Sequence, residues 1–326
     1  MEDMLKRVMQ GESLRVEEGV TILNQAEKEI LPALQHAYHI RYQHFGDETK
    51  LNMIINAKNG LCPENCGYCA QSSVSTSNET PYQLLSKEQL VAGAAEAERR
   101  KAGTYCIVAS GRGPSRREVS EVADAVTEIK NTYDLKICAC LGLLKEGQAA
   151  QLEQAGVDRY NHNVNTHKDH HDHITTSHTY DDRVTTVNEA KSAGISPCSG
   201  IIAGMGETDE QLIDTMRELR ELKADSVPIN FLHPVPGTPL GDRPKLSPQK
   251  ALAVLVAARF MLPDKEIRVA GGREEILRSM QPLALYPANA IFVGDYLTTD
   301  GQTAALDHDM IEAAGFKIES ESKVHV

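Results

Sequence analysis

Three cysteines, Cys62, Cys66 and Cys69, lie within eight residues and have the spacing C-x3-C-x2-C. Thiolates bind soft metals, and zinc and iron–sulfur sites usually take four protein ligands. This run supplies three, and the next cysteine is distant, at Cys106. A cluster held by three thiolates keeps one metal position open for a ligand, as catalytic metal sites do. The spacing favours such a site over half of a zinc site, because zinc sites usually pair C-x2-C or Cys/His units.

The elements that position these cysteines alternate between strand-like and helical patterns, which predicts a parallel sheet. The expected strands are residues 51–57, 105–110, 136–142, 158–164, 196–204, 226–232, 266–272 and 289–297. Eight is the number that closes a (β/α)8 TIM barrel, so we expect this α/β fold. The cysteine loop follows the first strand, at the carboxyl end of the barrel, where active sites of such barrels lie.

No low-complexity linker or charge block marks a domain boundary. Apolar residues at helical spacing predict an N-terminal helical extension over residues 1–46, and we expect the barrel over 47–300 and a C-terminal helix and tail over 301–326. Helix starts are indicated by the capping boxes Ser86/Gln89 and Ser115/Glu118 and by the cap Ser247-Pro248.

Composition excludes several classes of protein. The net charge of −12, from 34 basic and 46 acidic residues, argues against nucleic acid or an anionic membrane as a partner. The first residues lack the apolar core of a secretory signal, and the longest apolar run, 251–262, is too short to cross a bilayer. Seven clustered cysteines suit reduced ligands better than a disulfide framework, so we expect a cytoplasmic location.

The expected strands carry polar residues where a barrel interior normally holds branched aliphatic side chains. These residues are Cys106, Cys138, Cys140, Asn161, Asn163, Cys198, Asn230 and Arg268. Because burying a guanidinium and several amides without partners is costly, we expect a ligand cavity with a second metal centre. A lone strand cysteine is most often a small buried hydrophobe, which is the interpretation we favour for Cys140.

Histidines are concentrated between His162 and His178. Such a tract can bind metal, but a polar loop after the fourth strand explains it more simply. We favour the loop and expect only His162 to lie at the site.

The cysteine triplet resembles the signature of the radical S-adenosylmethionine superfamily. When Cys106, Cys138, Cys198 and Arg268 are considered with the triplet, the chain resembles the biotin synthase family over nearly its whole length. The matching blocks are GLCPENCGYCAQS, GTYCIVASGRG, LKICACLGLL, GVDRYNHN, ITTSHTYDDR, PCSGIIAGMGET, SVPINFL, PGTPL, IRVAGGRE and ANAIFVGDYLTT.

The resemblance implies two clusters and one further cofactor. Cys62, Cys66 and Cys69 match the ligands of a 4Fe–4S cluster, and Cys106, Cys138, Cys198 and Arg268 match those of a 2Fe–2S cluster. Positions that match contacts to S-adenosylmethionine are Tyr68, Asn163, Asn165, Arg183, Gly204 and Glu207, and those that match substrate contacts are Asn161, Asn163 and Asn230. Asn165 departs from the aspartate of some members, which keeps hydrogen bonding but loses a charge.

The activity implied is sulfur insertion that converts dethiobiotin to biotin, the last step of biotin biosynthesis. Unactivated C–H carbons offer neither acid nor electrophile, so the clusters and S-adenosylmethionine carry the chemistry and no side chain is expected as a catalyst. The resemblance also implies a reducing flavodoxin-like or ferredoxin-like partner and a homodimer.

Two alternatives remain. A hydrogenase-maturation or methylornithine-type radical barrel would share the triplet but has no need for Cys106, Cys138, Cys198 and Arg268 together. An electron-transfer or structural zinc protein would not cleave S-adenosylmethionine.

Overall fold

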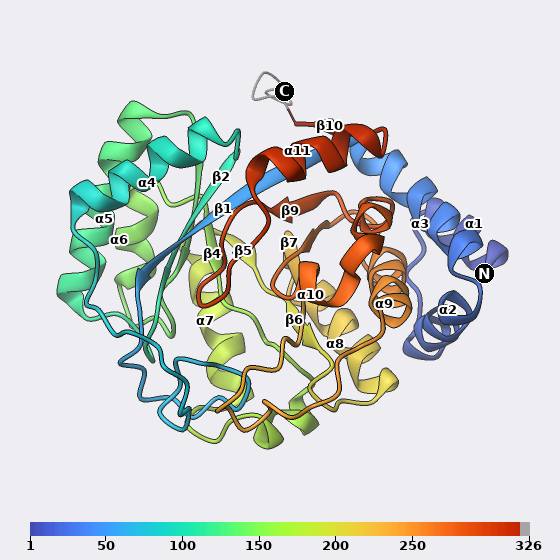
Figure 1. The fold of residues 1–326 in the computed structure, drawn as a ribbon, viewed down its shortest axis with the longest axis horizontal. Coiled ribbons are helices and arrows are strands. Elements are labelled where there is room, and N and C mark those ends of the chain that lie inside the picture. The colour runs from blue at the N-terminus through green and yellow to red at the C-terminus, as the bar shows by residue number, and fades with distance from the viewer. Residues whose placement is uncertain (320–326) are drawn as a thin grey trace.

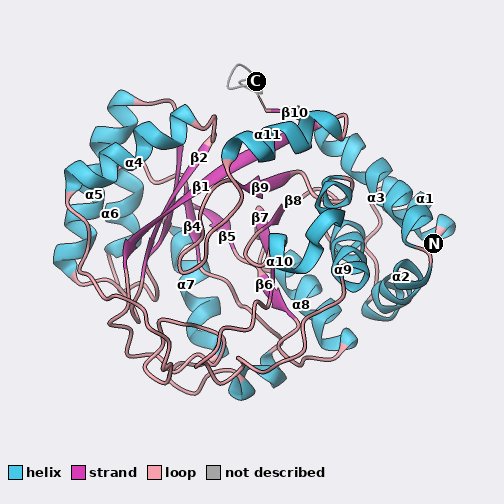
Figure 2. Cartoon of the chain, in the orientation of Figure 1, coloured by secondary structure: helices cyan, strands magenta, loops and turns pink. Residues whose placement is uncertain are grey.

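The computed structural model describes residues 1–319, and residues 320–326 of the expected C-terminal tail lie outside it. Its strands are β1 (Glu48–Lys58), β2 (Thr104–Ala109), β3 (Lys136–Cys140), β4 (Arg159–Asn161), β5 (Ser196–Cys198), β6 (Ile201–Ala203), β7 (Ser226–Phe231), β8 (Glu266–Val269), β9 (Ala290–Phe292) and β10 (Lys317–Ile318). Figure 2 shows helices around much of the barrel, loops along its lower side and β10 at the outer rim beside α11.

The strands close into a parallel barrel, which confirms the predicted (β/α)8 class. Neighbours run in the order β1-β2-β3-β4-β5-β7-β8-β9, and β9 pairs back with β1 through Lys50 and Ala290. The expected strand 196–204 is two short strands, β5 and β6, which both pair with β7 and share one place in the barrel. The interruption lies at Gly200, where an added Cβ would stand 1.9 Å from the Pro228 carbonyl oxygen.

The α-helices are α1 (Glu2–Met9), α2 (Val16–Lys28), α3 (Ile30–Phe45), α4 (Lys87–Arg99), α5 (Arg116–Thr132), α6 (Gln148–Gln154), α7 (Tyr180–Ser192), α8 (Asp209–Glu221), α9 (Pro248–Met261), α10 (Arg273–Leu277) and α11 (Ala304–Ala313). Two 3-10 helices, η1 (Lys168–His173) and η2 (Arg278–Leu285), complete the set in the described residues. The three predicted caps are present: Ser86, Ser115 and Ser247 each accept a backbone N–H from three residues on.

Helix α9 carries the longest apolar run of the chain, and the structure explains why. It packs against β8 on one side and against α2, α3 and α8 on others, so nearly all of its residues are buried (Figure 1). A helix covered all round needs apolar residues all round. No helix within residues 1–319 is both long and apolar enough to cross a membrane.

Candidate functional site

A cavity of about 310 Å³ runs from the barrel interior to the carboxyl ends of the strands. Its wall includes most of the residues singled out from the sequence: Cys62, Cys66, Tyr68, Cys69, Cys106, Cys138, Asn161, Asn163, Asn165, Arg183, Asn230 and Arg268. Residues from seven separate segments of the chain therefore meet around one space, as the expected cavity required.

The cysteine triplet lies in the loop after β1, at the mouth of the cavity. The Gly67 N–H donates to the Ile174 carbonyl at 2.8 Å, and the Gly67 carbonyl accepts from the Leu240 N–H at 3.0 Å. The Asn65 side-chain oxygen accepts from the Ser177 N–H at 3.1 Å. The loop is thus fixed by backbone and amide hydrogen bonds to two distant segments, so its conformation does not depend on the metal alone.

Burial affects how the triplet thiols ionise. It raises the pKa of Cys62, and it raises the pKa of Cys69 to about 12. Metal binding requires thiolates, so loading this site releases protons and depends on the charge that the metal supplies.

The second group of cysteines lies inside the barrel. Cys106 on β2 is directly paired in register with Cys138 on β3, and both line the cavity. Cys198 on β5 is paired in register with Asn161 on β4, and its sulfur is 3.2 Å from Nδ2 of Asn161. The neighbouring thiol of Cys106 is the main cause of the raised pKa of Cys138, and the thiol of Cys138 is the main cause of the raised pKa of Cys198.

Arg268 on β8 faces the same space and is fully buried. Its Nε is buried without a hydrogen-bond partner, although a buried guanidinium normally satisfies its donors. Three thiols, which bind metal as thiolates, and a guanidinium that is not fully hydrogen-bonded lie together here, and these residues fit the expected 2Fe–2S group.

Cys140 differs from our prediction of a buried hydrophobe. It is only half-buried and lines the cavity, two residues from Cys138. Successive residues of a strand alternate in direction, so Cys140 faces the same side as Cys138 but lies one step nearer the carboxyl end. Burial raises the pKa of its thiol to about 12.

The residues expected to contact the cofactor and substrate form hydrogen bonds with one another. Asn165 has a left-handed backbone, with φ at 69°, a conformation that asparagine tolerates better than most residues. Its Nδ2 donates to the Tyr68 hydroxyl at 2.7 Å. Arg183 donates to the Asn163 carbonyl at 2.8 Å. The Asn163 side-chain oxygen accepts from Asn161 at 3.1 Å and from the Gly200 N–H at 3.0 Å, which steadies the interruption between β5 and β6.

Asn230 lines the cavity, but its amide is already engaged at both ends. Nδ2 donates to the Ile201 carbonyl and Oδ1 accepts from the Gly271 N–H, each at 3.0 Å. Asn230 therefore ties neighbouring segments together and has one N–H and one lone pair left for a ligand.

Gly204 and Glu207 are not brought to the cavity wall. They lie in the turn after β6, where the Glu207 carboxylate accepts from the Gly204 N–H at 2.6 Å. The other Glu207 oxygen is buried without a partner. Their expected contact with S-adenosylmethionine therefore stays a prediction.

Sequence reasoning missed a buried pair at the cavity mouth, Glu64 and His178. His178 does lie in a polar loop, between η1 and α7, but it is buried and lines the cavity, so His162 is not the only histidine of the tract at the site. Nδ1 of His178 forms a hydrogen bond with Glu64, and Nε2 accepts from Nε of Arg183 at 2.8 Å. Glu64 lies between Cys62 and Cys66 in the sequence, and this position was the one sign that it belongs to the site.

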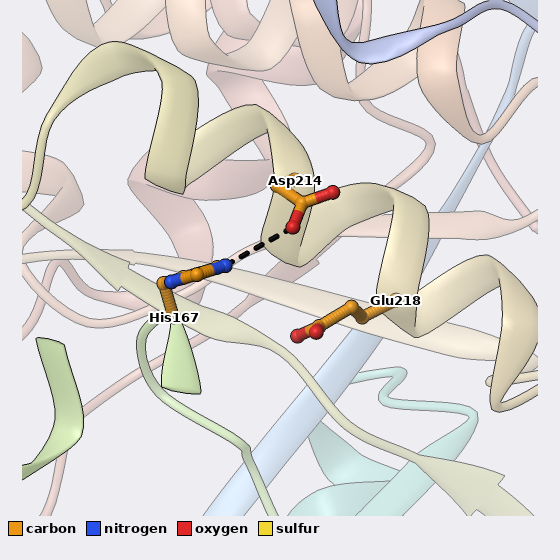
Figure 3. A group of neighbouring side chains, drawn as sticks. All are labelled: His167, Asp214 and Glu218. Atoms are coloured by element: carbon orange, nitrogen blue, oxygen red, sulfur yellow. Dashed lines mark hydrogen bonds and ion pairs between the residues drawn. The ribbon is translucent and has the colours of Figure 1, made fainter. Parts of the chain in front are cut away.

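A further group, His167, Asp214 and Glu218, lies outside the cavity wall (Figure 3). Nε2 of His167 is 3.0 Å from Asp214, and Nδ1 accepts the Asp169 N–H at the start of η1. Metal binding through Nε2 would leave a proton on Nδ1, opposed to that backbone donor. Tyr180 and Arg217 already donate to the two carboxylates. The group is explained as a helix cap and ion pair.

Comparison with known proteins supports the same interpretation. Residues 59–219 match the Radical SAM superfamily, and residues 228–317 match the Biotin and Thiamin Synthesis associated domain. A biotin synthase of Geobacillus thermodenitrificans is 59% identical over 316 residues, 97% of this chain and 95% of the relative. One of Bacillus pumilus is 55% identical over 318 residues, covering 98% and 96%.

Solved structures at low sequence identity show the fold alone. A methylornithine synthase superposes with a TM-score of 0.84 at 18% identity and covers 98% of each chain. The FeFe-hydrogenase maturase from Carboxydothermus hydrogenoformans has a TM-score of 0.79 at 17% identity, covering 97% of this chain and 78% of that one.

Proposed function

Because the chain belongs to the biotin synthase family, we propose that it inserts one sulfur atom into dethiobiotin to form biotin, the last step of biotin biosynthesis. The observation that carries this proposal is the presence of two separate cysteine groups on one cavity. Cys62, Cys66 and Cys69 lie at its mouth, while Cys106 and Cys138 line its interior and Cys198 contacts Asn161 of the same wall. One group suits a source of radicals and the other a source of sulfur.

Each cysteine group has its own proposed metal centre. The triplet holds a 4Fe–4S cluster with one open iron for S-adenosylmethionine. Cys106, Cys138, Cys198 and Arg268 hold a 2Fe–2S cluster. When bound, these groups supply a 5′-deoxyadenosyl radical and a sulfide, chemistry that side chains cannot provide for unactivated carbons.

The chain's own residues position the reactants and protect them. Tyr68, Asn163, Asn165 and Arg183 lie on the wall of the same cavity, and we assign them to S-adenosylmethionine. Asn161, Asn163 and Asn230 are assigned to the substrate, whose ureido ring offers donors and acceptors that match amides.

Apolar residues complete the wall. Ile54, Val108 and Phe292 pack around Cys106 and Cys138. The apolar side chains around Cys106 and Cys138 help to keep water and polar hydrogen donors, which would quench a radical, away from this part of the cavity.

Several attributes rest on the family resemblance. We propose a reducing flavodoxin-like or ferredoxin-like partner, a homodimer and a cytoplasmic location. We also propose the division into a helical extension over 1–46, a barrel over 47–300 and a C-terminal segment over 301–326.

Anaerobic reconstitution with iron and sulfide tests the function. The loaded protein should release 5′-deoxyadenosine from S-adenosylmethionine when a reductant is supplied, and it should form biotin only when dethiobiotin is present. Release of 5′-deoxyadenosine without any biotin would instead favour a different radical enzyme. A preparation that lacks sulfide-to-iron absorption bands would contradict both.

A further inference from the structure

Glu266 is a buried carboxylate two residues before Arg268 on β8, so both side chains face the barrel interior. It accepts from Arg159 on β4 at 2.8 and 2.9 Å, from the Ser226 hydroxyl on β7 at 2.8 Å, and from Arg268 at 2.7 Å. Lys50 on β1 lies 3.5 Å away. One carboxylate therefore joins residues of four barrel strands beneath the cavity.

The charges of this network do not cancel. Three cations, Lys50, Arg159 and Arg268, surround one carboxylate, and the interior cysteines lie beside them. The Glu266 carboxylate is the anionic partner of the Arg268 guanidinium in this network.

Arg268 is held from one terminal nitrogen. That nitrogen, Nη2, donates to both Glu266 and Ser226, the latter at 3.1 Å. The guanidinium carbon lies 5.1 Å from the centre of the Phe292 ring. Nε has no hydrogen-bond partner. The carboxylate and the ring restrict the orientation of the guanidinium while part of its donor capacity stays unused.

We propose that Glu266 is a positioning residue that fixes the Arg268 guanidinium beside Cys106, Cys138 and Cys198, and thereby sets how this arginine meets the second cluster. The inference rests on the proposed function. Glu266 does not touch the reacting atoms, and it acts through Arg268. A carboxylate that only neutralises buried charge would stabilise the fold but would leave the electronic properties of the cluster unchanged.

A double-mutant cycle separates these roles. Wild-type protein, Glu266→Gln, Arg268→Ala and the double variant are reconstituted anaerobically, and the 2Fe–2S absorption and Mössbauer spectra are recorded. Glu266→Gln should change both spectra in the same direction as Arg268→Ala, including loss of the signal if Arg268→Ala loses it. The double variant should show no change beyond that of Arg268→Ala. A wild-type spectrum for folded Glu266→Gln, or additive changes in the double variant, would overturn the inference.

Folding is checked by circular dichroism, because removing one partner of a buried ion pair is strongly destabilising. Should Glu266→Gln not fold, Glu266→Asp takes its place, since it keeps the charge but withdraws the carboxylate by one methylene group. Its spectrum should also move toward that of Arg268→Ala, and an unchanged spectrum contradicts the proposal. Glu275→Gln, which breaks the exposed pair with Lys245, is the matched control and should leave the spectra unchanged.

The measurement on wild-type protein distinguishes failure of the proposed function from failure of the inference about Glu266. If wild-type protein forms no 2Fe–2S centre, the proposed function fails and the inference fails with it. If wild-type protein forms the centre and the Glu266 variants match it, the inference alone fails.

Discussion

Nδ1 of His178 donates a hydrogen bond to Glu64, a carboxylate that lies between the first two cysteines of the triplet. Arg183 donates to the other ring nitrogen, Nε2. Since an arginine can only donate, Nε2 is an acceptor and the single ring proton resides on Nδ1. A neutral histidine thus links the cysteine loop to an arginine of the cavity wall, across 114 residues of sequence.

Replacing His178 by alanine should disturb the cysteine loop and Arg183 together. Mutation of residues that orient metal ligands without binding the metal typically lowers metal affinity or activity by about 10–100-fold. We expect a loss of that order in kcat/KM for 5′-deoxyadenosine formation, with a raised KM for S-adenosylmethionine. His173→Ala is the control, because His173 is exposed in the same tract. Equal kinetics for the two variants would remove His178 from this role.

His178 should also make stability depend on pH. Burial, and then Arg183, lower its pKa to about 4 from a usual value of 6.5, despite the opposing effect of Glu64. The unfolded chain therefore takes up the proton first, so this stabilisation is complete above about pH 6.5 and is lost as pH falls toward 4. The contribution is at most ~3 kcal/mol.

Urea unfolding of the metal-free protein between pH 7 and pH 4.5 measures this dependence. The difference in free energy of unfolding between wild type and His178→Gln should shrink as the pH falls. A difference that stays constant over this range would contradict a neutral, buried His178.

Replacing Cys62, Cys66 or Cys69 by alanine should abolish reductive cleavage of S-adenosylmethionine, because the open iron position disappears with the cluster. Cys140→Ala is the matched control, since it removes a thiol from the same cavity but from neither proposed ligand set. Iron content and 5′-deoxyadenosine are measured for each variant. If one of these variants cleaves S-adenosylmethionine at the wild-type rate, the cysteine that it lacks is not a cluster ligand.

Replacing Asn230 by alanine should weaken dethiobiotin binding more than S-adenosylmethionine binding. The structure adds a second effect, because the Ile201 carbonyl and the Gly271 N–H would lose their partner. Unpaired buried groups of this kind cost ~1–3 kcal/mol, so a lower free energy of unfolding is expected as well. Calorimetric titration with each ligand checks the first effect, and equal losses for both ligands would place Asn230 at the cofactor.

The barrel could be predicted from the sequence because the patterns that indicate its strands and helices are local. Alternating patterns and the caps at Ser86, Ser115 and Ser247 each depend on a few neighbouring residues. The inward position of Cys106 and Cys138 follows from strand alternation in the same way.

What was missed depends on contacts between distant segments. No local sequence pattern predicts the hydrogen bond between Glu64 and His178. The same holds for the hydrogen bonds of Asn230 with Ile201 and Gly271. Glu266 sits two residues from Arg268, yet only the folded barrel brings Arg159 to it. The partial exposure of Cys140 likewise depends on the shape of the cavity.

The origin of the inserted sulfur tests the central claim most directly. Three interior cysteines on separate strands are more than a radical source needs, so we take the second cluster to be the sulfur donor. Protein reconstituted with heavy-isotope sulfide, and assayed in buffer with light sulfide, should yield heavy-isotope biotin at no more than one equivalent per cluster, with matching loss of 2Fe–2S absorbance. Unlabelled biotin from the labelled protein would contradict this account and leave the second centre as an electron relay.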